Sequence, residues 1–148
     1  MRKFIDRQQE MAVLEKEYRR EGSSFVVVYG RRRVGKTALI NRFCEGKRSI
    51  YFLATEESEG ENRNAFKELV SDSLQNRLLG SANLTQWEPI FQVIAEESKK
   101  SRIVLVIDEF QYLGKANAAF PSVLQKIWDQ FLGKENVMLI LCGSLIHM

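Results

Sequence analysis

The stretch that most restricts the fold is VVVYGRRRVGKTALI, residues 26–40. It begins with a continuous apolar, β-branched run, which is typical of a strand buried on both faces of a parallel sheet. Gly30 and Gly35 then bracket a basic loop, and Lys36 and Thr37 open a segment whose apolar residues recur with helical spacing. The stretch therefore predicts a strand, a tight loop and a helix in immediate succession.

The rest of the chain repeats this alternation. Apolar runs at residues 49–54, 102–109 and 136–144 predict three more strands. Amphipathic patterns predict helices at residues 5–20, 36–46, 62–80, 85–100 and 120–133, and an acidic connection at residues 55–63. Strands that alternate with helices indicate an α/β fold with a mainly parallel sheet between two helical layers.

The composition fits one soluble globular domain. The chain has 148 residues, of which 45% are hydrophobic and 28% charged, and it contains no apolar run long enough to cross a membrane. Cys44 and Cys142 have no metal-ligand spacing, which favours a reducing cytoplasm. The net charge of +3 is mild and does not by itself argue for nucleic-acid binding.

The glycine loop has the spacing of a phosphate-binding loop. Gly30, Gly35, Lys36 and Thr37 match G-x-x-x-x-G-K-[ST], the Walker A pattern, in the required strand-to-helix context. The backbone N–H groups of Gly30 to Ala38 can form a concave anion site, helped by the positive end of the helix. Lys36 can reach the β- and γ-phosphates, and the Thr37 hydroxyl can coordinate Mg²⁺.

The strand predicted at residues 102–109 ends in two carboxylates, those of Asp108 and Glu109. In a parallel sheet, this strand end lies at the same edge as the phosphate loop. Five apolar residues followed by Asp108 fit a Walker B strand, in which Asp108 would hold Mg²⁺. Glu109 could orient a water molecule and accept its proton, which favours hydrolysis of a nucleoside triphosphate. Ser144 ends the fourth predicted strand, where it would either contact the γ-phosphate or cap the next turn.

Two rival classes fit less well. A guanine-specific N-K-x-D motif, which Ras-type GTPases need, is absent from the sequence. A small-molecule kinase would share the phosphate loop, but no arginine-bearing lid segment can be identified. The only histidine, His147, is interpreted as incidental.

The chain resembles the archaeal-type ATPases, which are related to the AAA+ and STAND groups of P-loop ATPases. The matching segments run from Phe4 to Ser144, and GRRRVGKT together with DEFQYL is the most specific combination. The resemblance implies a sheet in which the fourth strand separates the Walker A and Walker B strands, so that these two are not adjacent. It also implies ATP and Mg²⁺ as ligands and the sensor-1 position for Ser144.

The resemblance divides the chain into an N-terminal box with its helix, residues 1–22, and a nucleotide-binding core, residues 23–148. Phe4, Ile5 and Arg7 are then candidates for the adenine pocket. Family members typically continue with a fifth strand, a helical lid and further domains, so residues 1–148 are expected to form the N-terminal part of the domain. Without a fifth strand, the apolar strand FVVVY would be an exposed edge, and self-association through it is expected.

Three functions remain open from the sequence. The first is an ATPase whose hydrolysis drives a conformational switch in attached domains, with ATP and ADP as its ligands. The second is a nucleotide-dependent signalling or DNA-linked scaffold with little turnover. The third is a nucleic-acid-binding fragment with a vestigial nucleotide site. Separately from these three, DNA is a candidate partner that further domains would contact.

The arginines of the loop are expected to play a secondary part. Arg31, Arg32, Arg33 and Val34 occupy variable loop positions, where the backbone binds phosphate and side chains mostly point outward. The three arginines would then raise the local electrostatic potential for ATP, or contact a lid, a neighbouring subunit or DNA.

Overall fold

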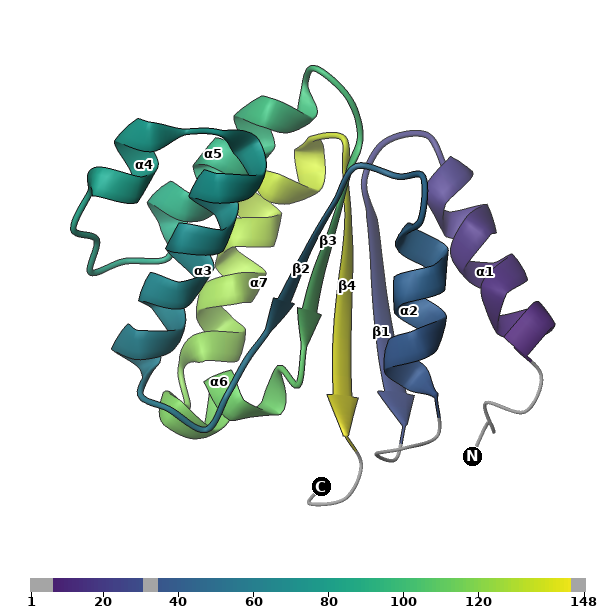
Figure 1. Ribbon diagram of the computed structural model, residues 1–148, viewed down its shortest axis with the longest axis horizontal. Helices are drawn as coiled ribbons and strands as arrows, with labels where there is room; N and C mark the ends of the chain where they lie inside the picture. The colour runs from purple at the N-terminus through teal and green to yellow at the C-terminus, as the bar shows by residue number, and fades with distance from the viewer. Residues whose placement is uncertain (1–6, 31–34, 145–148) are drawn as a thin grey trace.

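The computed structural model describes residues 7–30 and 35–144 of the chain. Its centre is a sheet of four parallel strands in the order β1-β4-β3-β2 (Figure 1). The strands are β1 (Ser24–Gly30), β2 (Ser49–Leu53), β3 (Ile103–Asp108) and β4 (Val137–Ser144). The order confirms that β4 lies between β1 and β3, so the strands predicted to carry the Walker A and Walker B patterns are not adjacent.

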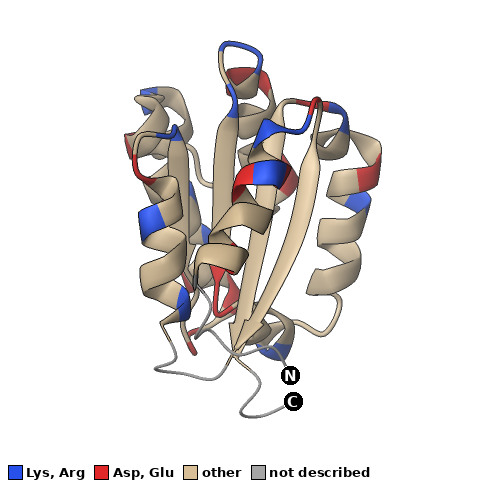
Figure 2. Ribbon diagram, turned by 90° about the vertical axis from the view of Figure 1, so that its right-hand side faces the viewer, with Lys and Arg blue, Asp and Glu red and all other residues tan. Residues whose placement is uncertain are grey.

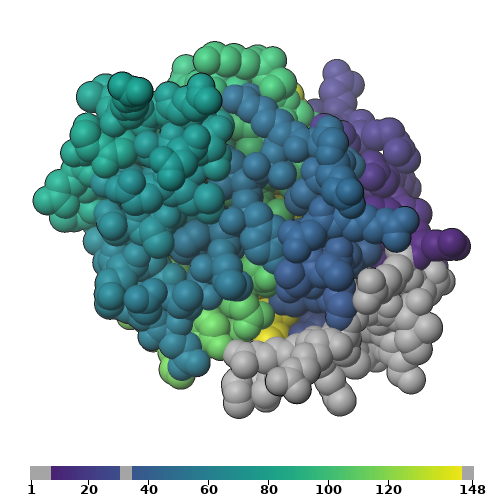
Figure 3. Space-filling view, in the orientation of Figure 1, coloured from purple at the N-terminus to yellow at the C-terminus, as the bar shows by residue number. Residues whose placement is uncertain are grey.

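Helices cover the two faces of the sheet unequally. The helices α1 (Arg7–Arg19) and α2 (Lys36–Cys44) lie on one face. The other face carries α3 (Glu59–Leu74), α4 (Arg77–Ser81), α5 (Glu88–Ser98), α6 (Gln111–Ala116) and α7 (Phe120–Gln130), followed by a 3₁₀ turn, η1 (Leu132–Lys134). Figure 3 shows α1 and α2, in purple and blue, on one side of the molecule and the teal α3–α5 region on the other. The predicted three-layer α/β/α architecture is confirmed.

The central strands β3 and β4 are buried along their whole length. Side chains alternate between the faces of a strand, so each central strand must be apolar on both sides. In β3, Leu105 and Ile107 belong to the core beneath α3, α5 and α7, whereas Val104 and Val106 pack beneath α1 and α2. The continuous apolar runs of the sequence are explained by this double burial.

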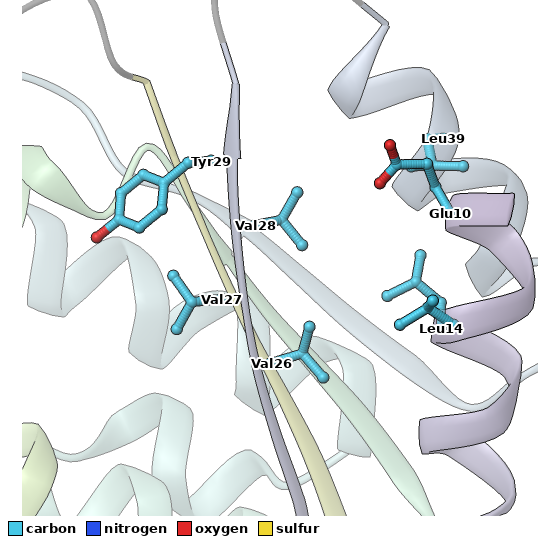
Figure 4. Close-up of a pocket in the computed structure, with 8 residues that line it drawn as sticks. Glu10, Leu14, Val26, Val27, Val28, Tyr29 and Leu39 are labelled. Carbon is cyan, nitrogen blue, oxygen red and sulfur yellow. The ribbon is translucent and has the colours of Figure 1, made fainter. Parts of the chain in front are cut away.

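Strand β1 differs from the prediction of a strand buried on both faces. It pairs only with β4 among the described strands, and its burial alternates along the strand. Val26 and Val28 point toward α1 and α2 (Figure 4), whereas the side chains of Val27 and Tyr29 point to the other face and remain 45% and 40% exposed. On this face the Phe25 ring packs against Trp128 of α7 at 5.0 Å, but Val27 and Tyr29 stay partly exposed, so the prediction was wrong for these two residues.

The predicted helix over residues 62–80 is two helices. Gln75 takes a left-handed conformation with φ of 52° and ends α3, and the Asn76 side chain then caps α4 by accepting from the Leu79 N–H. Gly80 permits the close approach of α4 to α3, since a Cβ there would lie 2.5 Å from the Ser71 hydroxyl. The amphipathic pattern of the sequence continues across this break, because α3 and α4 both bury apolar side chains.

Two helices also begin at different residues from those predicted. Helix α3 begins at Glu59 behind a capping box of Ser58 and Glu61, so the predicted acidic connection is shorter than expected. The helix predicted at residues 85–100 starts later, since α5 begins after Trp87 with Pro89 in its first turn. Within the described residues, no helix has both the length and the apolar character needed to cross a bilayer.

Candidate functional site

The carboxyl ends of three strands meet at one edge of the sheet. Gly30 of β1 pairs in register with Ser144 of β4, and Asp108 of β3 pairs with Cys142, two residues before Ser144. All four strand arrows in Figure 1 point to this edge. The predicted site residues Gly30, Asp108 and Ser144 are therefore brought to one edge by parallel pairing alone.

Helix α2 begins at the same edge. Gly35 precedes it with φ of 84°, a left-handed conformation that glycine adopts without steric cost. Lys36, Thr37 and Ala38 form its first turn, where backbone N–H groups have no acceptor inside the helix and the helix dipole is positive. The turn is thus suited to bind an anion.

Lys36 joins α2 to the end of β3. Its ammonium nitrogen lies 2.8 Å from Asp108 Oδ1 and 3.2 Å from Glu109 Oε1, and the lysine side chain is only 6% exposed. Burial alone would lower the Lys36 pKa, but the hydrogen bond to Asp108 and the negative charge of Asp108 outweigh it and raise the pKa. Lys36 therefore carries its charge at neutral pH.

Asp108 accepts hydrogen bonds at both of its carboxylate oxygens. Besides Lys36, Oδ1 accepts the Glu109 backbone N–H at 2.8 Å. Oδ2 accepts the Thr37 hydroxyl at 3.4 Å and the Tyr51 hydroxyl. Thr37 and Asp108 thus present a hydroxyl and a carboxylate side by side, which are the hard oxygen ligands that Mg²⁺ prefers, and the two residues fit the predicted metal.

Tyr51 was not among the predicted site residues. Burial, reinforced by the bond to Asp108, raises the Tyr51 pKa well above its ordinary value of 10, so the phenol remains a donor. The available signal was a tyrosine inside the apolar strand SIYFLA, because a buried tyrosine hydroxyl usually requires a polar partner.

Glu109 follows the strand in an unusual backbone conformation. Its φ is 54°, in the left-handed region that non-glycine residues adopt at an energetic cost. Its Oε2 accepts the Gln111 side-chain amide at 3.1 Å, and Gln111 Oε1 in turn accepts the Ser144 backbone N–H at 3.4 Å. Gln111 therefore links the predicted catalytic residues Glu109 and Ser144, a connection that the sequence reasoning missed.

Several predicted ligand-binding residues lie outside the described residues. They are Phe4, Ile5, Arg31, Arg32, Arg33 and Val34. Arg7 is the first residue of α1. Their roles at the nucleotide stay predictions.

The cysteines do not form part of this site as nucleophiles. Cys44 is half-buried and Cys142 is buried, and both are free thiols. Burial, with a smaller contribution from the charge of Asp108, raises the Cys142 pKa to about 12. Cys142 is consequently a neutral thiol at physiological pH.

Comparison with known proteins identifies the family. The model of an ATPase domain found predominantly in Archaea matches residues 4–146. An uncharacterized protein of Methanocaldococcus jannaschii is 33% identical over 145 residues, which cover 98% of this chain but 30% of that protein. A protein of the same organism, described as an uncharacterized ATP-binding protein, is 42% identical over 45 residues, which cover 30% of this chain and 76% of that protein.

Solved structures share the fold. The Walker-type ATPase of Pyrococcus abyssi superposes with a TM-score of 0.69 at 20% identity, over 93% of this chain and 45% of that one. The Aeropyrum pernix ORC2 protein, solved with ADPNP and ADP, also gives 0.69, at 16% identity over 96% and 42% of the two chains. The chain therefore spans less than half of the length of these structures and 30% of the first relative. With the family model matching nearly from end to end, the chain belongs to the archaeal-type ATPase domains.

Proposed function

We propose that this chain binds ATP together with Mg²⁺ and hydrolyses it to ADP and phosphate, and that hydrolysis drives a conformational switch in attached domains. One observation carries the proposal: the Lys36 ammonium lies between the carboxylates of Asp108 and Glu109, at the first turn of a helix that follows a glycine loop. A cation at the positive end of a helix attracts phosphate, and the two carboxylates serve the metal and the water.

Binding would begin at the first turn of α2. Its free N–H groups and the adjoining loop would hold the phosphates, and Lys36 would turn from the carboxylates to the β- and γ-phosphates. Thr37 and Asp108 would hold Mg²⁺, which neutralises phosphate charge when it is bound. Movement of Lys36 to the phosphates would remove its contact with Glu109 Oε1, and Glu109 would then serve the water molecule.

Hydrolysis would then follow an in-line course. Glu109 would orient a water molecule and accept its proton while the water oxygen bonds to the γ-phosphorus. The bond from the γ-phosphorus to the bridging oxygen would break, and the electron pair would leave with ADP. Ser144 would contact the γ-phosphate, and its link to Glu109 through Gln111 would couple that contact to the base.

The described surface does not favour the nucleic-acid alternative. At the end where the strands begin, basic and acidic segments lie side by side (Figure 2). Ion pairs there join Lys47 to Glu15 at 2.9 Å and Arg48 to Glu97 at 2.7 Å. Basic residues that are paired in this way contribute little net attraction for a phosphate backbone.

The test compares the wild type with Glu109→Gln in the full-length gene product. ATP affinity and steady-state hydrolysis are measured in the presence of Mg²⁺. Retained binding with hydrolysis reduced at least about a hundredfold supports the ATPase, since loss of a general base typically costs that much. Equal and negligible hydrolysis in both proteins would instead support a switch without turnover. No binding of ATP by the wild type would refute the proposal.

A further inference from the structure

The side chain of Tyr51 reaches Asp108 from a strand that carries none of the predicted site residues. Tyr51 pairs in register with Val106 and Leu53 pairs with Asp108, so Tyr51 and Asp108 point to the same face of the sheet. That face is the one on which α2 begins, because Val106 and Tyr51 both pack in the core beneath α1 and α2. The phenol is thereby aimed at the carboxylate from the side opposite to β4.

The four described donors to Asp108 have different fates in the proposed function. The Lys36 ammonium would move to phosphate, and the Thr37 hydroxyl would turn to the metal. The Glu109 N–H holds Oδ1 at 2.8 Å, and the Tyr51 hydroxyl holds Oδ2. The proposed function assigns neither of those two donors to phosphate or metal, so they would keep holding the carboxylate after nucleotide binds.

Of the two contacts that would remain, only the one from Tyr51 is made by a side chain. The Glu109 N–H belongs to the backbone next to Asp108 and holds only Oδ1. Without the phenol, Oδ2 would keep Thr37 at 3.4 Å as its described donor, and the buried carboxylate could rotate when Thr37 leaves. Groups that orient a metal ligand through a hydrogen bond commonly affect metal affinity about 10- to 100-fold.

We propose that Tyr51 is a positioning residue that determines how strongly the nucleotide site holds Mg²⁺, by fixing the Asp108 carboxylate. This inference rests on the proposed function, because it assumes that Asp108 serves the metal of a bound nucleotide. It assigns no contact between Tyr51 and ATP. Tyr51 therefore affects the metal-dependent part of nucleotide binding and leaves the metal-free part unchanged.

The experiment measures ATP affinity by calorimetry, in EDTA and over a range of Mg²⁺ concentrations, for the wild type and Tyr51→Phe. The phenylalanine keeps the ring and removes only the donor. We expect the affinity in EDTA to be unchanged and the Mg²⁺ concentration for half-maximal enhancement to rise about tenfold. Electron paramagnetic resonance of bound Mn²⁺ with ATP gives a second readout that does not depend on turnover.

Tyr18→Phe is the matched control. The Tyr18 ring packs edge-on against Phe43 at 6.1 Å, and it lies near Lys47 and Arg102 at the opposite edge of the sheet. This variant should behave as the wild type does in both conditions. In an Asp108→Asn background, which removes the carboxylate that Tyr51 positions, Tyr51→Phe should cause no further loss of Mg²⁺ enhancement.

The outcomes separate the two proposals. Mg²⁺ dependence in Tyr51→Phe that equals that of Tyr18→Phe overturns the role of Tyr51 and leaves the ATPase proposal intact. An equal loss of affinity with and without Mg²⁺ also overturns it, because the tyrosine would then support the pocket in general. A wild type that binds no ATP in either condition overturns both.

Discussion

The Lys36 ammonium and the Asp108 carboxylate form a buried ion pair at 2.8 Å, although 72 residues separate them in the chain. Both side chains are almost fully buried, at 6% and 3% exposure. A buried charge that loses its partner destabilises a protein strongly, whereas removal of both charges costs much less. The pair thus links the stability of the nucleotide-free protein to the residues proposed for ATP binding.

Lys36→Met should reduce the stability of the nucleotide-free protein and also weaken ATP binding strongly. We expect the free energy of unfolding to fall by about 3 kcal/mol, because Asp108 is left buried with an uncompensated charge. Urea denaturation without nucleotide measures the change. The double variant Lys36→Met/Asp108→Asn should lose less than the sum of the single variants, and strict additivity would show that the pair is not coupled.

Replacement of Arg32 by alanine should leave ATP affinity within about threefold of the wild type, because backbone N–H groups make the phosphate contacts in such loops. Calorimetric titration with ATP and Mg²⁺ checks this. Lys36→Met, in which the buried ammonium is lost, is the contrasting variant and should bind ATP far more weakly. A collapse of ATP binding in Arg32→Ala would assign the arginine to the nucleotide instead.

Strand β1 should cause self-association of the 148-residue chain. Its outer edge has no described partner strand, Val27 is 45% exposed, and a groove of about 250 Å³ lies between β1 and α1 (Figure 4). Lysine on an edge strand opposes pairing with another chain. Val27→Lys should raise the dissociation constant of the self-associated form at least about tenfold, equivalent to 1.4 kcal/mol.

Analytical ultracentrifugation over a range of concentrations measures this association. Leu78→Lys is the control, since Leu78 is 83% exposed on α4 and far from the β1 edge. It should associate as the wild type does. A wild-type chain that stays monomeric at all concentrations would contradict the prediction.

Gly143→Ala should destabilise the end of β4. An added Cβ would lie 2.8 Å from Cε1 of Phe110 and 3.3 Å from the ring of Tyr29. Overpacking of this kind typically costs about 1 to 3 kcal/mol. Thermal or urea unfolding measures the loss, and Phe110→Leu in the same chain should recover part of it. The absence of any recovery would locate the strain elsewhere.

Glu59 should make the protein more stable above pH 5 than at pH 3. The hydrogen bond from Asn117 lowers the Glu59 pKa below its ordinary value of 4.5, with smaller help from Trp87 and Arg63. The folded state then binds the proton more weakly than the unfolded state, so this stabilisation is present above pH 4.5 and is lost as the pH falls through the folded pKa.

Unfolding of Glu59→Gln at pH 6 and pH 3 tests this. The variant should be less stable at pH 6 by no more than about 1 kcal/mol, since the carboxylate is partly solvated, and its stability should fall less on acidification. Glu68→Gln, at an exposed position of the same helix, is the control. A pH dependence in Glu59→Gln identical to that of the wild type would exclude the predicted linkage.

Local patterns in the sequence determined the elements that build the site. The apolar runs located the four strands of the described part of the chain, and the glycine spacing located the start of α2 at Lys36. Parallel pairing then places Asp108 and Ser144 at one edge, a consequence of strand direction that needs no further information. The family resemblance, rather than any local pattern, supplied the position of β4 between β1 and β3.

Only the tertiary structure decided which side chains meet at that edge. The contacts of Tyr51 with Asp108 and of Gln111 with Ser144 depend on strand register and on the left-handed turn at Glu109, which bring together residues far apart in sequence. The exposed edge of β1 was expected from the family resemblance, but the exposure of Val27 and Tyr29 on its face and the break at Gln75 were not, because periodicity indicates the character of a residue and not what covers it. Local propensity therefore identified the elements, and packing between them determined the site.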